Sequence, residues 1–334
     1  MTRTGTTAQV LLRIEELVKL YPVLRRGIFR SKQAGLIRAV DNVSFEIRQG
    51  ETLALVGESG CGKTTTARSM LFLTSPTSGR AYFDGVDILD IFRRGNRAEV
   101  LKVRRELQYV FQDPYLSLNP RWSIGDTISE PLRVHQHLPK SDWKSRVDEL
   151  LELVGLEHYH AWRYPHEFSG GQRQRVGIAR ALAGEPKFLI CDEPVSSLDV
   201  SVRAQILNLL LDLQDRLALT YLYISHDLSS VRFVSDRVAV MYLGKIVEIA
   251  DVDELFTHPL HHYSHALLAA IPVPDPESAA RSSVLKGEVP SAMNPPNGCR
   301  FHPRCAAALP QCSREEPPLH GIAEGHLVAC HNPR

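Results

Sequence analysis

Short apolar runs alternate with longer amphipathic stretches along most of this 334-residue chain. Two apolar runs of strand length, Lys187–Cys191 and Thr220–Ile224, are separated by a segment in which apolar residues recur at helical spacing from Val202 to Leu213. Further runs of strand length lie at Val10–Ile14, Val43–Ile47 and Thr52–Val56. Because a strand, a helix and a strand in succession are typical of a parallel sheet, the pattern predicts an α/β fold.

Turn residues between extended runs predict antiparallel hairpins beside that fold. Asp84-Gly85 lies inside the extended stretch Arg80–Ile88, and Gly244-Lys245 interrupts the apolar stretch Arg237–Ile249. The segment Arg25–Arg38 is basic and contains glycine, so we expect a surface loop or a hairpin excursion there.

The middle and the end of the chain depart from the alternating pattern. Residues from about 113 to 185 begin with turn residues and continue with helical periodicity, as in Trp143–Val154, which predicts a helical insertion. After residue 257 proline, histidine and cysteine dominate and the periodicity fades. We therefore expect a main domain over residues 9–257 and a C-terminal extension over residues 258–334.

Charge and hydropathy narrow the class of protein. The chain has 39 Lys and Arg against 38 Asp and Glu, a net charge of +1, which gives no general attraction to nucleic acid. No apolar run approaches the roughly 18 residues that a membrane-spanning helix needs, and the N-terminal sequence does not resemble a signal peptide. We expect a cytosolic protein whose six cysteines are reduced or bind metal.

A phosphate-binding loop is predicted between an apolar strand and a helix. Residues 57–64 fit the pattern G-x-x-x-x-G-K-[ST], in which backbone N–H groups surround phosphate oxygens. Lys63 would reach the β- and γ-phosphates of ATP, and the Thr64 hydroxyl would bind Mg²⁺. Other residues expected to contact the nucleotide are Gly57, Ser59, Gly60, Cys61, Gly62 and Thr65. A chance glycine-rich turn is the alternative, and the flanking strand and helix disfavour it.

Polar residues after later strands supply candidate catalytic groups. Asp192 and Glu193 end an apolar run, where ligands bind in α/β sheets, so Asp192 would hold Mg²⁺ and Glu193 would polarise the attacking water. His226 follows the next apolar run and could bond the γ-phosphate, and Gln112 could bind Mg²⁺ and sense the same phosphate. Each of these residues taken alone has an ordinary structural explanation, and their order along the chain favours the catalytic one.

A second anion site is predicted on the helical insertion. Ser169-Gly170-Gly171-Gln172 precedes an amphipathic helix, and the donors at a helix start bind anions. Since the chain already has a phosphate loop, this segment would contact the nucleotide of a second subunit in a head-to-tail dimer. A plain N-capped helix is the alternative.

These motifs together resemble the ATP-binding cassette (ABC) ATPases over roughly residues 9–257. The segment 169–172 resembles that family's signature, Ser197-Leu198-Asp199 its D-loop, and Gln112 and His226 its Q- and H-loops. The resemblance implies that Asp199 and Tyr21 also contact nucleotide, with Tyr21 stacking on adenine. It further implies a P-loop NTPase (RecA-like) core with an antiparallel β subdomain and a helical insertion, followed by a small Cys/Pro-rich C-terminal extension.

A narrower resemblance is to the oligopeptide/dipeptide (and nickel) importer ATPases. Tyr109–Arg121 is similar to their Q-loop, and His258-Pro259, Tyr263 and Ala266–Pro272 to their C-terminal part. This resemblance implies import of peptides at the cytoplasmic face of the cell membrane, with Asp113–Pro131 facing a permease. The implied partners are a second ABC ATPase subunit, two membrane permease subunits and an extracytoplasmic solute-binding protein. The alternatives are import of nickel or another small solute, a soluble non-transport ABC ATPase, or a regulatory cassette without turnover.

Four cysteines lie in the Pro-rich extension. Cys299, Cys305, Cys312 and Cys330 have the spacing C-x₅-C-x₆-C-x₁₇-C, which suits either a [4Fe–4S] cluster or a structural zinc. Similarity of Gly298–Cys305 to the peptide-importer sequence favours the iron–sulfur cluster over zinc or free thiols. Cys61 and Cys191 lie within nucleotide motifs and are interpreted as small packing residues.

Overall fold

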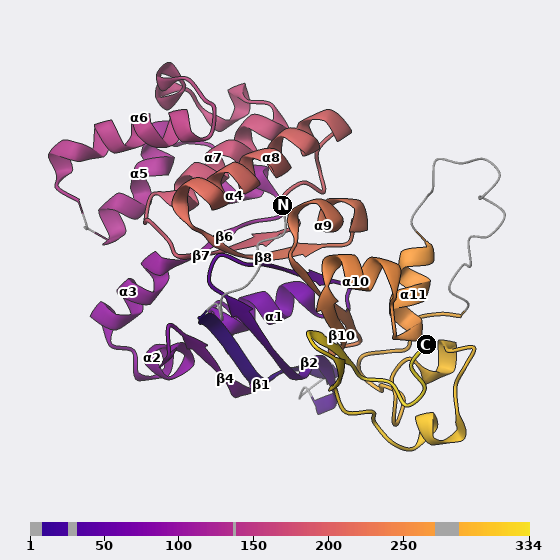
Figure 1. The fold of residues 1–334 in the computed structure, drawn as a ribbon. Helices are drawn as coiled ribbons and strands as arrows, with labels where there is room; N and C mark the ends of the chain where they lie inside the picture. Colours follow the sequence, from indigo (N-terminus) through magenta and orange to yellow (C-terminus); the bar gives the residue numbers. More distant parts are fainter. Residues whose placement is uncertain (1–8, 26–31, 136–137, 271–286) are drawn as a thin grey trace. The chain divides into compact units, whose positions relative to one another are not determined.

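The computed structural model describes residues 9–25, 32–135, 138–270 and 287–334. Figure 1 draws its helices and strands. The chain forms two compact units. Unit 1 consists mainly of Asp90–Ser225 with the short segment Ile47–Thr52, and unit 2 of Leu11–Glu46, Leu53–Leu89 and His226–Arg334.

Three parallel strands form the centre of unit 1, in the order β8-β7-β6. They are β6 (Leu107–Val110), β7 (Phe188–Asp192) and β8 (Thr220–Ser225). Every residue of β7 and β8 is buried, which explains their continuous apolar runs, because strands covered on both faces do not alternate. Helix α8 (Val200–Leu217) connects these two strands, so the predicted strand–helix–strand order is confirmed.

Helices make up the rest of unit 1. Between β6 and β7 the regular elements of the described residues are all helices, as predicted for the insertion, and α5, α6 and α7 pack against one another. The helix predicted over 143–154 is α6. The α-helices before β6 are α2 (Ile88–Arg94) and α3 (Arg97–Glu106). Those in the described residues between β6 and β7 are α4 (Pro114–Ser117), α5 (Ile124–His135), α6 (Trp143–Leu153) and α7 (Gly170–Leu182). Short 3₁₀ helices lie at Lys140–Asp142, His158–Trp162 and Pro165–Glu167.

One sheet of unit 2 is antiparallel, with the strand order β2-β1-β4-β5. Its strands are β1 (Val10–Arg25), β2 (Lys32–Arg48), β4 (Ser78–Phe83) and β5 (Val86–Asp87). The predicted turn at Asp84-Gly85 joins β4 to β5, and both residues have positive φ, 50° and 79°. The basic segment 25–38 was predicted to be a surface loop or a hairpin excursion. Its described residues belong to the end of β1 and the start of β2, which agrees with the hairpin, and residues 26–31 lie outside the described part of the chain.

The other sheet of unit 2 has the strand order β11-β12-β10-β9-β3. Its strands are β3 (Thr52–Val56), β9 (Arg237–Tyr242), β10 (Lys245–Asp251), β11 (His320–Ala323) and β12 (His326–Val328). Strand β3 runs parallel to β9, and the others pair antiparallel. The α-helices in the described residues of this unit are α1 (Lys63–Met70), α9 (Leu228–Val234), α10 (Val252–Thr257) and α11 (His262–Ala269), and short 3₁₀ helices lie at His302–Arg304 and Pro310–Ser313.

The tail, residues 287–334, is tied to this second sheet, which the sequence pattern did not predict. Strand β12 pairs with β10, and Glu248 of β10 is fully buried. Its carboxylate accepts hydrogen bonds from the Leu260 and His261 N–H groups at 2.7 and 3.0 Å and contacts His326 Nε2 at 2.7 Å. A buried carboxylate needs such partners, so this cluster fastens both α11 and the tail to β10.

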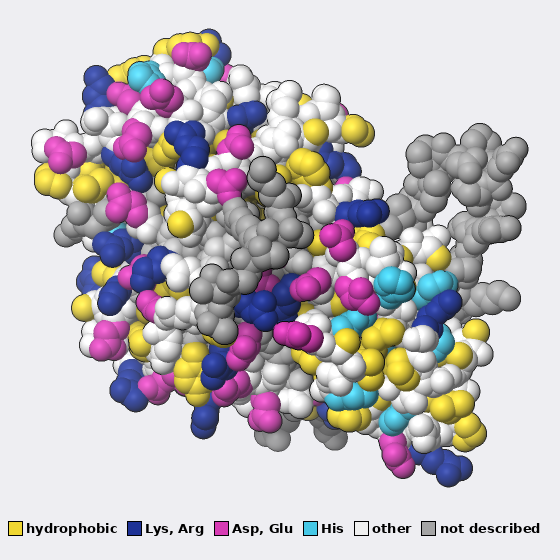
Figure 2. All heavy atoms as spheres, in the orientation of Figure 1, with side chains coloured by type: hydrophobic (Ala, Val, Ile, Leu, Met, Phe, Trp, Pro, Cys, Tyr) yellow, Lys and Arg dark blue, Asp and Glu magenta, His cyan; other side chains and the backbone are white. Residues whose placement is uncertain are grey.

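No helix in the described residues is long and apolar enough to cross a membrane. One part of the surface of unit 2 is rich in histidine and hydrophobic side chains. Figure 2 shows histidine and hydrophobic side chains gathered over the region that α10, α11 and the tail form in Figure 1.

Candidate functional site

The phosphate loop, residues 57–64, joins β3 to α1 in the predicted strand–loop–helix context. Two of its glycines are required by close backbone approach and positive φ. A Cβ on Gly57 (φ 150°) would lie 2.1 Å from the Met241 carbonyl oxygen, and one on Gly62 (φ 113°) would lie 2.2 Å from the Ala39 carbonyl oxygen. No L-residue side chain fits at either position, so the backbone conformation of the loop requires glycine at residues 57 and 62.

Lys63 lies at the centre of the loop. Its side chain is buried, and its Nζ donates hydrogen bonds to the carbonyl oxygens of Gly57 at 2.8 Å and Glu58 at 3.1 Å. The backbone of the loop therefore surrounds the Lys63 ammonium group, which keeps a positive charge next to the backbone N–H groups of the loop. Thr64 and Thr65 are half-buried in the first turn of α1, and Ser59 and Gly60 are exposed.

Cys61 and Cys191 are both buried, as predicted for packing residues. Burial raises the pKa of each thiol, so both stay protonated at neutral pH. Tyr21, the proposed adenine contact, lies on β1 with 36% of its surface exposed. Lys19 Nζ lies 4.7 Å from the centre of the Tyr21 ring, which shows that a cation already packs on this ring.

In unit 1, Asp192 and Glu193 accept hydrogen bonds from residues that are far away in the sequence. Asp192, the last residue of β7, is 1% exposed, and the Tyr109 hydroxyl donates a hydrogen bond to its Oδ2 at 2.5 Å. Tyr109 was not predicted as a site residue. Its place on the neighbouring strand β6, which pairs with β7, is the signal that could have indicated it.

Glu193 and Gln112, predicted as separate catalytic groups, are brought together. Glu193 has φ 47°, an uncommon value for a non-glycine residue, and its N–H donates to the Ile224 carbonyl oxygen at 2.9 Å. This backbone turn directs its carboxylate to Gln112, whose Nε2 donates to Glu193 Oε2 at 2.8 Å. His226 directly follows β8 and is exposed. The unusual backbone at Glu193 fits a functional position, where strain is often found.

Ser169 caps helix α7, which agrees with the plain structural explanation of this residue. Its hydroxyl accepts from the Gln172 N–H at 3.3 Å, and Gln172 Oε1 accepts from the Ser169 N–H at 3.0 Å. A Cβ on Gly171 would lie 2.3 Å from Val202 Cγ1, so glycine allows the start of α7 to approach α8. Asp199 caps α8, accepting from the Val202 N–H at 2.9 Å.

The four tail cysteines are free thiols in one part of the tail. Burial raises the pKa of Cys299 to about 11 and also raises the pKa values of Cys305 and Cys330, and the thiols affect one another electrostatically. In the part of the chain that the structure describes, however, no three His, Cys, Asp or Glu side chains converge closely enough to hold a metal ion. As placed, Cys299, Cys305, Cys312 and Cys330 therefore do not fit a cluster or a zinc ion.

Comparison with known proteins identifies the family of these motifs. The ABC transporter model matches residues 40–196, and that of the oligopeptide/dipeptide transporter C-terminal region matches residues 247–312. The oligopeptide transport ATP-binding protein AppF of Bacillus subtilis is 48% identical over 330 residues, 98% of this chain and 99% of its own. The chain belongs to the ATP-binding subunits of the ABC transporter family. It is accordingly an ABC-type ATPase.

Further relatives agree with this membership. The probable peptide ABC transporter ATP-binding protein y4tS of Sinorhizobium fredii is 51% identical, covering 97% of this chain and 90% of its own. Among solved structures, the ATP-binding cassette MJ0796, in a dimeric post-hydrolysis state bound to ADP and Pi, has a TM-score of 0.62 at 29% identity. That match covers 72% of this chain and 98% of the other. The predicted P-loop α/β fold with an antiparallel subdomain and a helical insertion is thereby confirmed.

Proposed function

We propose that this chain is the ATP-hydrolysing subunit of an importer that carries peptides across the cytoplasmic membrane. The observation that supports it most is the near full-length similarity to an oligopeptide transport ATP-binding protein, together with the matching oligopeptide/dipeptide transporter C-terminal region. The intact set of nucleotide motifs favours a subunit that turns ATP over against a regulatory cassette that only binds it.

In the proposed reaction, the phosphate loop binds ATP through its N–H groups and Lys63. Mg²⁺, when bound, would neutralise charge on the phosphates, and the oxygen donors of Thr64, Gln112 and Asp192 suit this hard cation. Glu193 would orient and polarise the attacking water. Phosphoryl transfer depends mainly on positioning and on charge stabilisation, so a carboxylate held by a hydrogen bond from Gln112 is well suited to this role.

Other residues would complete the nucleotide site. His226 would donate a hydrogen bond to the γ-phosphate, and Tyr21 would stack on adenine. The signature segment, Ser169–Gln172, would contact the γ-phosphate bound by a second ATPase subunit, and Asp199 would lie beside the same interface. Ser169 can serve both purposes, because a hydroxyl that accepts one hydrogen bond still has a hydrogen to donate.

We place the protein at the cytoplasmic face of the membrane, with two permease subunits that receive solute from an extracytoplasmic binding protein. The segment Asp113–Pro131 would contact a permease. Tyr115 and Leu116 of α4 support this role, since they are 59% and 80% exposed and are both large and hydrophobic. Neighbouring exposed apolar residues commonly mark an interaction surface.

An iron–sulfur cluster remains a proposal for the tail. Four free cysteines in the tail support it, although their described positions would have to change to bind metal. Iron and sulfide determination on anaerobically purified protein tests it directly. Stoichiometric zinc in a colourless sample would favour zinc, and the lack of either would leave free thiols.

Uptake of labelled di- and oligopeptides by cells with and without this gene tests the function. We expect peptide uptake to be lost on deletion, restored by the wild-type gene, and not restored by the Glu193→Gln variant. The purified Glu193→Gln protein should bind ATP with wild-type affinity while its hydrolysis falls about a thousandfold. Unchanged peptide uptake with loss of nickel uptake would assign the transporter to a different solute.

A further inference from the structure

Glu58 is a carboxylate inside the phosphate loop. It occupies the second position of the loop, and its side chain is 25% exposed. A negative charge at this position repels the phosphates of a nucleotide bound by the neighbouring N–H groups, unless a cation neutralises it. The Lys63 ammonium does not bind this carboxylate, because its hydrogen bonds in the loop go to the carbonyl oxygens of Gly57 and Glu58 and to Cys61 Sγ.

Arg304 of the tail meets that carboxylate. Its Nη1 lies 2.8 Å from Glu58 Oε2 and its Nη2 lies 3.1 Å from Glu58 Oε1, a bidentate pair between residues 246 positions apart. The Arg304 side chain is 5% exposed, and hydrogen bonding to Glu58 raises its pKa, so it stays charged. Bidentate pairs between arginine and a carboxylate are strong and fix the orientation of both side chains.

The extension also holds the backbone of Glu58. The Tyr263 hydroxyl of α11 accepts a hydrogen bond from the Glu58 N–H at 2.8 Å. Tyr263 packs on Tyr242 at a ring distance of 4.6 Å, and Phe301 lies 5.4 Å from each of them. Arg304 Nη1 is also 3.4 Å from the Tyr242 hydroxyl. The carboxylate and the N–H of one loop residue are therefore both bound by residues after 257.

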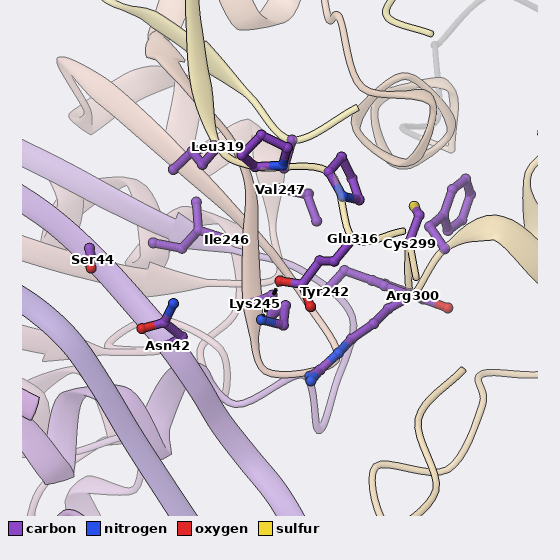
Figure 3. A pocket seen from close by; sticks show the side chains of 14 residues that line it. Asn42, Ser44, Tyr242, Lys245, Ile246, Val247, Cys299, Arg300, Glu316 and Leu319 are labelled. Atoms are coloured by element: carbon purple, nitrogen blue, oxygen red, sulfur yellow. Dashed lines mark ion pairs between the residues drawn. The ribbon is translucent and has the colours of Figure 1, made fainter. Parts of the chain in front are cut away.

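The tail segment around Arg304 is also bound to the strands and loops of unit 2. Arg300 bonds to Asp41 and to the Leu243 carbonyl oxygen. Figure 3 shows the neighbouring pocket of about 350 Å³, where Lys245 of β10 forms an ion pair with Glu316 of the tail at 2.5 Å. Since the tail is fastened on both sides of Arg304, the position of this guanidinium is set by the fold of the tail and not by the phosphate loop alone.

We propose that Arg304 is a positioning residue for ATP binding: it neutralises and orients Glu58, so that the phosphate loop faces the triphosphate without an opposing charge. The inference rests on the proposed role of residues 57–64 in binding ATP. It gives the C-terminal extension a direct part in the nucleotide site, through a residue that lies between Cys299 and Cys305 of the cysteine segment.

Nucleotide binding by the full-length chain tests this role, measured by competition against a fluorescent ATP analogue. Arg304→Gln leaves the Glu58 charge uncompensated, and we expect MgATP affinity to fall about tenfold. Because the repulsion grows with ligand charge, AMP affinity should fall by no more than about twofold. Arg304→Lys keeps the charge without the bidentate geometry and should recover most of the ATP affinity.

The double variant Glu58→Gln/Arg304→Gln distinguishes charge neutralisation from support of the tail. Removing both charges should bring MgATP affinity back to within about twofold of the wild type, because the opposing charge is gone. Arg314→Gln, which removes an exposed positive charge from the same tail, is the matched control and should bind ATP as the wild type does.

Two results would overturn the inference. Wild-type MgATP affinity in Arg304→Gln would show that Glu58 needs no neutralisation. A double variant as weak as Arg304→Gln, or an equal loss of ATP and AMP affinity, would reduce Arg304 to a structural contact. Lys63→Ala separates these results from failure of the loop assignment itself, since wild-type ATP affinity in that variant would show that residues 57–64 do not bind the phosphates.

Discussion

Two glycine-rich segments begin helices in this protein, and they are built differently. At α1 the residue before the helix is Gly62, with φ 113° and no side chain to cap the first turn. At α7 it is Ser169, whose hydroxyl caps the Gln172 N–H. The first turn of α1 therefore has no side-chain cap, whereas the signature segment satisfies one of the N–H groups of α7 with its own serine.

The glycines of the two segments also serve different purposes. Gly57 and Gly62 let the loop approach the backbone carbonyl oxygens of Met241 and Ala39. Gly171 instead makes room for one side-chain methyl group, Val202 Cγ1. The phosphate loop therefore requires glycine at both of these positions. The signature segment is a normally capped helix start, and its proposed function depends on a second subunit.

Among substitutions in these two segments, the largest effect is expected from Gly57→Ala. Because its Cβ meets a backbone oxygen that no other substitution can remove, ATP affinity should fall about a hundredfold. Titration with a fluorescent nucleotide measures this fall. Near-normal affinity would show that the loop can take another backbone path and would weaken the contrast with the signature segment.

Ser169→Asp should lower turnover without loss of stability. Aspartate caps a helix about as well as serine, so the thermal midpoint should stay close to that of the wild type. Its charge would repel the phosphate bound by the other subunit, and steady-state ATP hydrolysis by the assembled transporter should fall at least about tenfold. Ser169→Asn, an uncharged cap, is the control. Equal hydrolysis by all three proteins would leave Ser169 as a helix cap alone.

Gly171→Ala should reduce stability by about 1–3 kcal/mol, because the added methyl group overlaps Val202 Cγ1. The obstacle here is a side chain, so the second substitution Val202→Ala should restore most of the loss. Urea unfolding of the single and double variants measures both effects. A double variant no more stable than Gly171→Ala would indicate a backbone requirement like that of the phosphate loop.

The smallest effect concerns the cap of α8. The hydrogen bond from the Val202 N–H, with that from Ser201, lowers the pKa of Asp199 below its ordinary value of 3.8. A lowered folded-state pKa means that this contribution to stability is present above the unfolded pKa and is lost as the pH falls through the folded value. Asp199→Asn should therefore narrow the difference between urea midpoints measured near pH 6 and near pH 3. An unchanged difference would show that other carboxylates dominate acid unfolding.

Features that depend on near neighbours in the sequence were predictable. The phosphate loop, the cap at Ser169 and the turn at Asp84-Gly85 involve residues within a few positions of one another. Each is defined by backbone geometry that only certain residue types can adopt. The predicted boundary at residue 257 and the individual catalytic roles remain predictions.

The contacts that the sequence did not reveal join distant residues. Tyr109 with Asp192, Glu248 with His326, and Glu58 with Arg304 are separated by 83, 78 and 246 positions. Sequence periodicity carries no information about which charged residues will meet, because such pairs depend on strand order and on where the tail docks. The cysteine spacing illustrates the same limit, since it predicted a metal site that the described positions of the thiols do not form.

The amino-acid sequence by itself determined the phosphate loop, the α/β pattern and the membership in a family of ATPases. These features depend on short-range sterics and on hydrophobic periodicity, and both involve residues that are close together in the sequence. Only the tertiary structure decided that Gln112 bonds to Glu193 and that a tail arginine neutralises a carboxylate of the phosphate loop. The physical reason is that an ion pair or a hydrogen bond requires two groups within about 3 Å, and only the folded chain brings them that close.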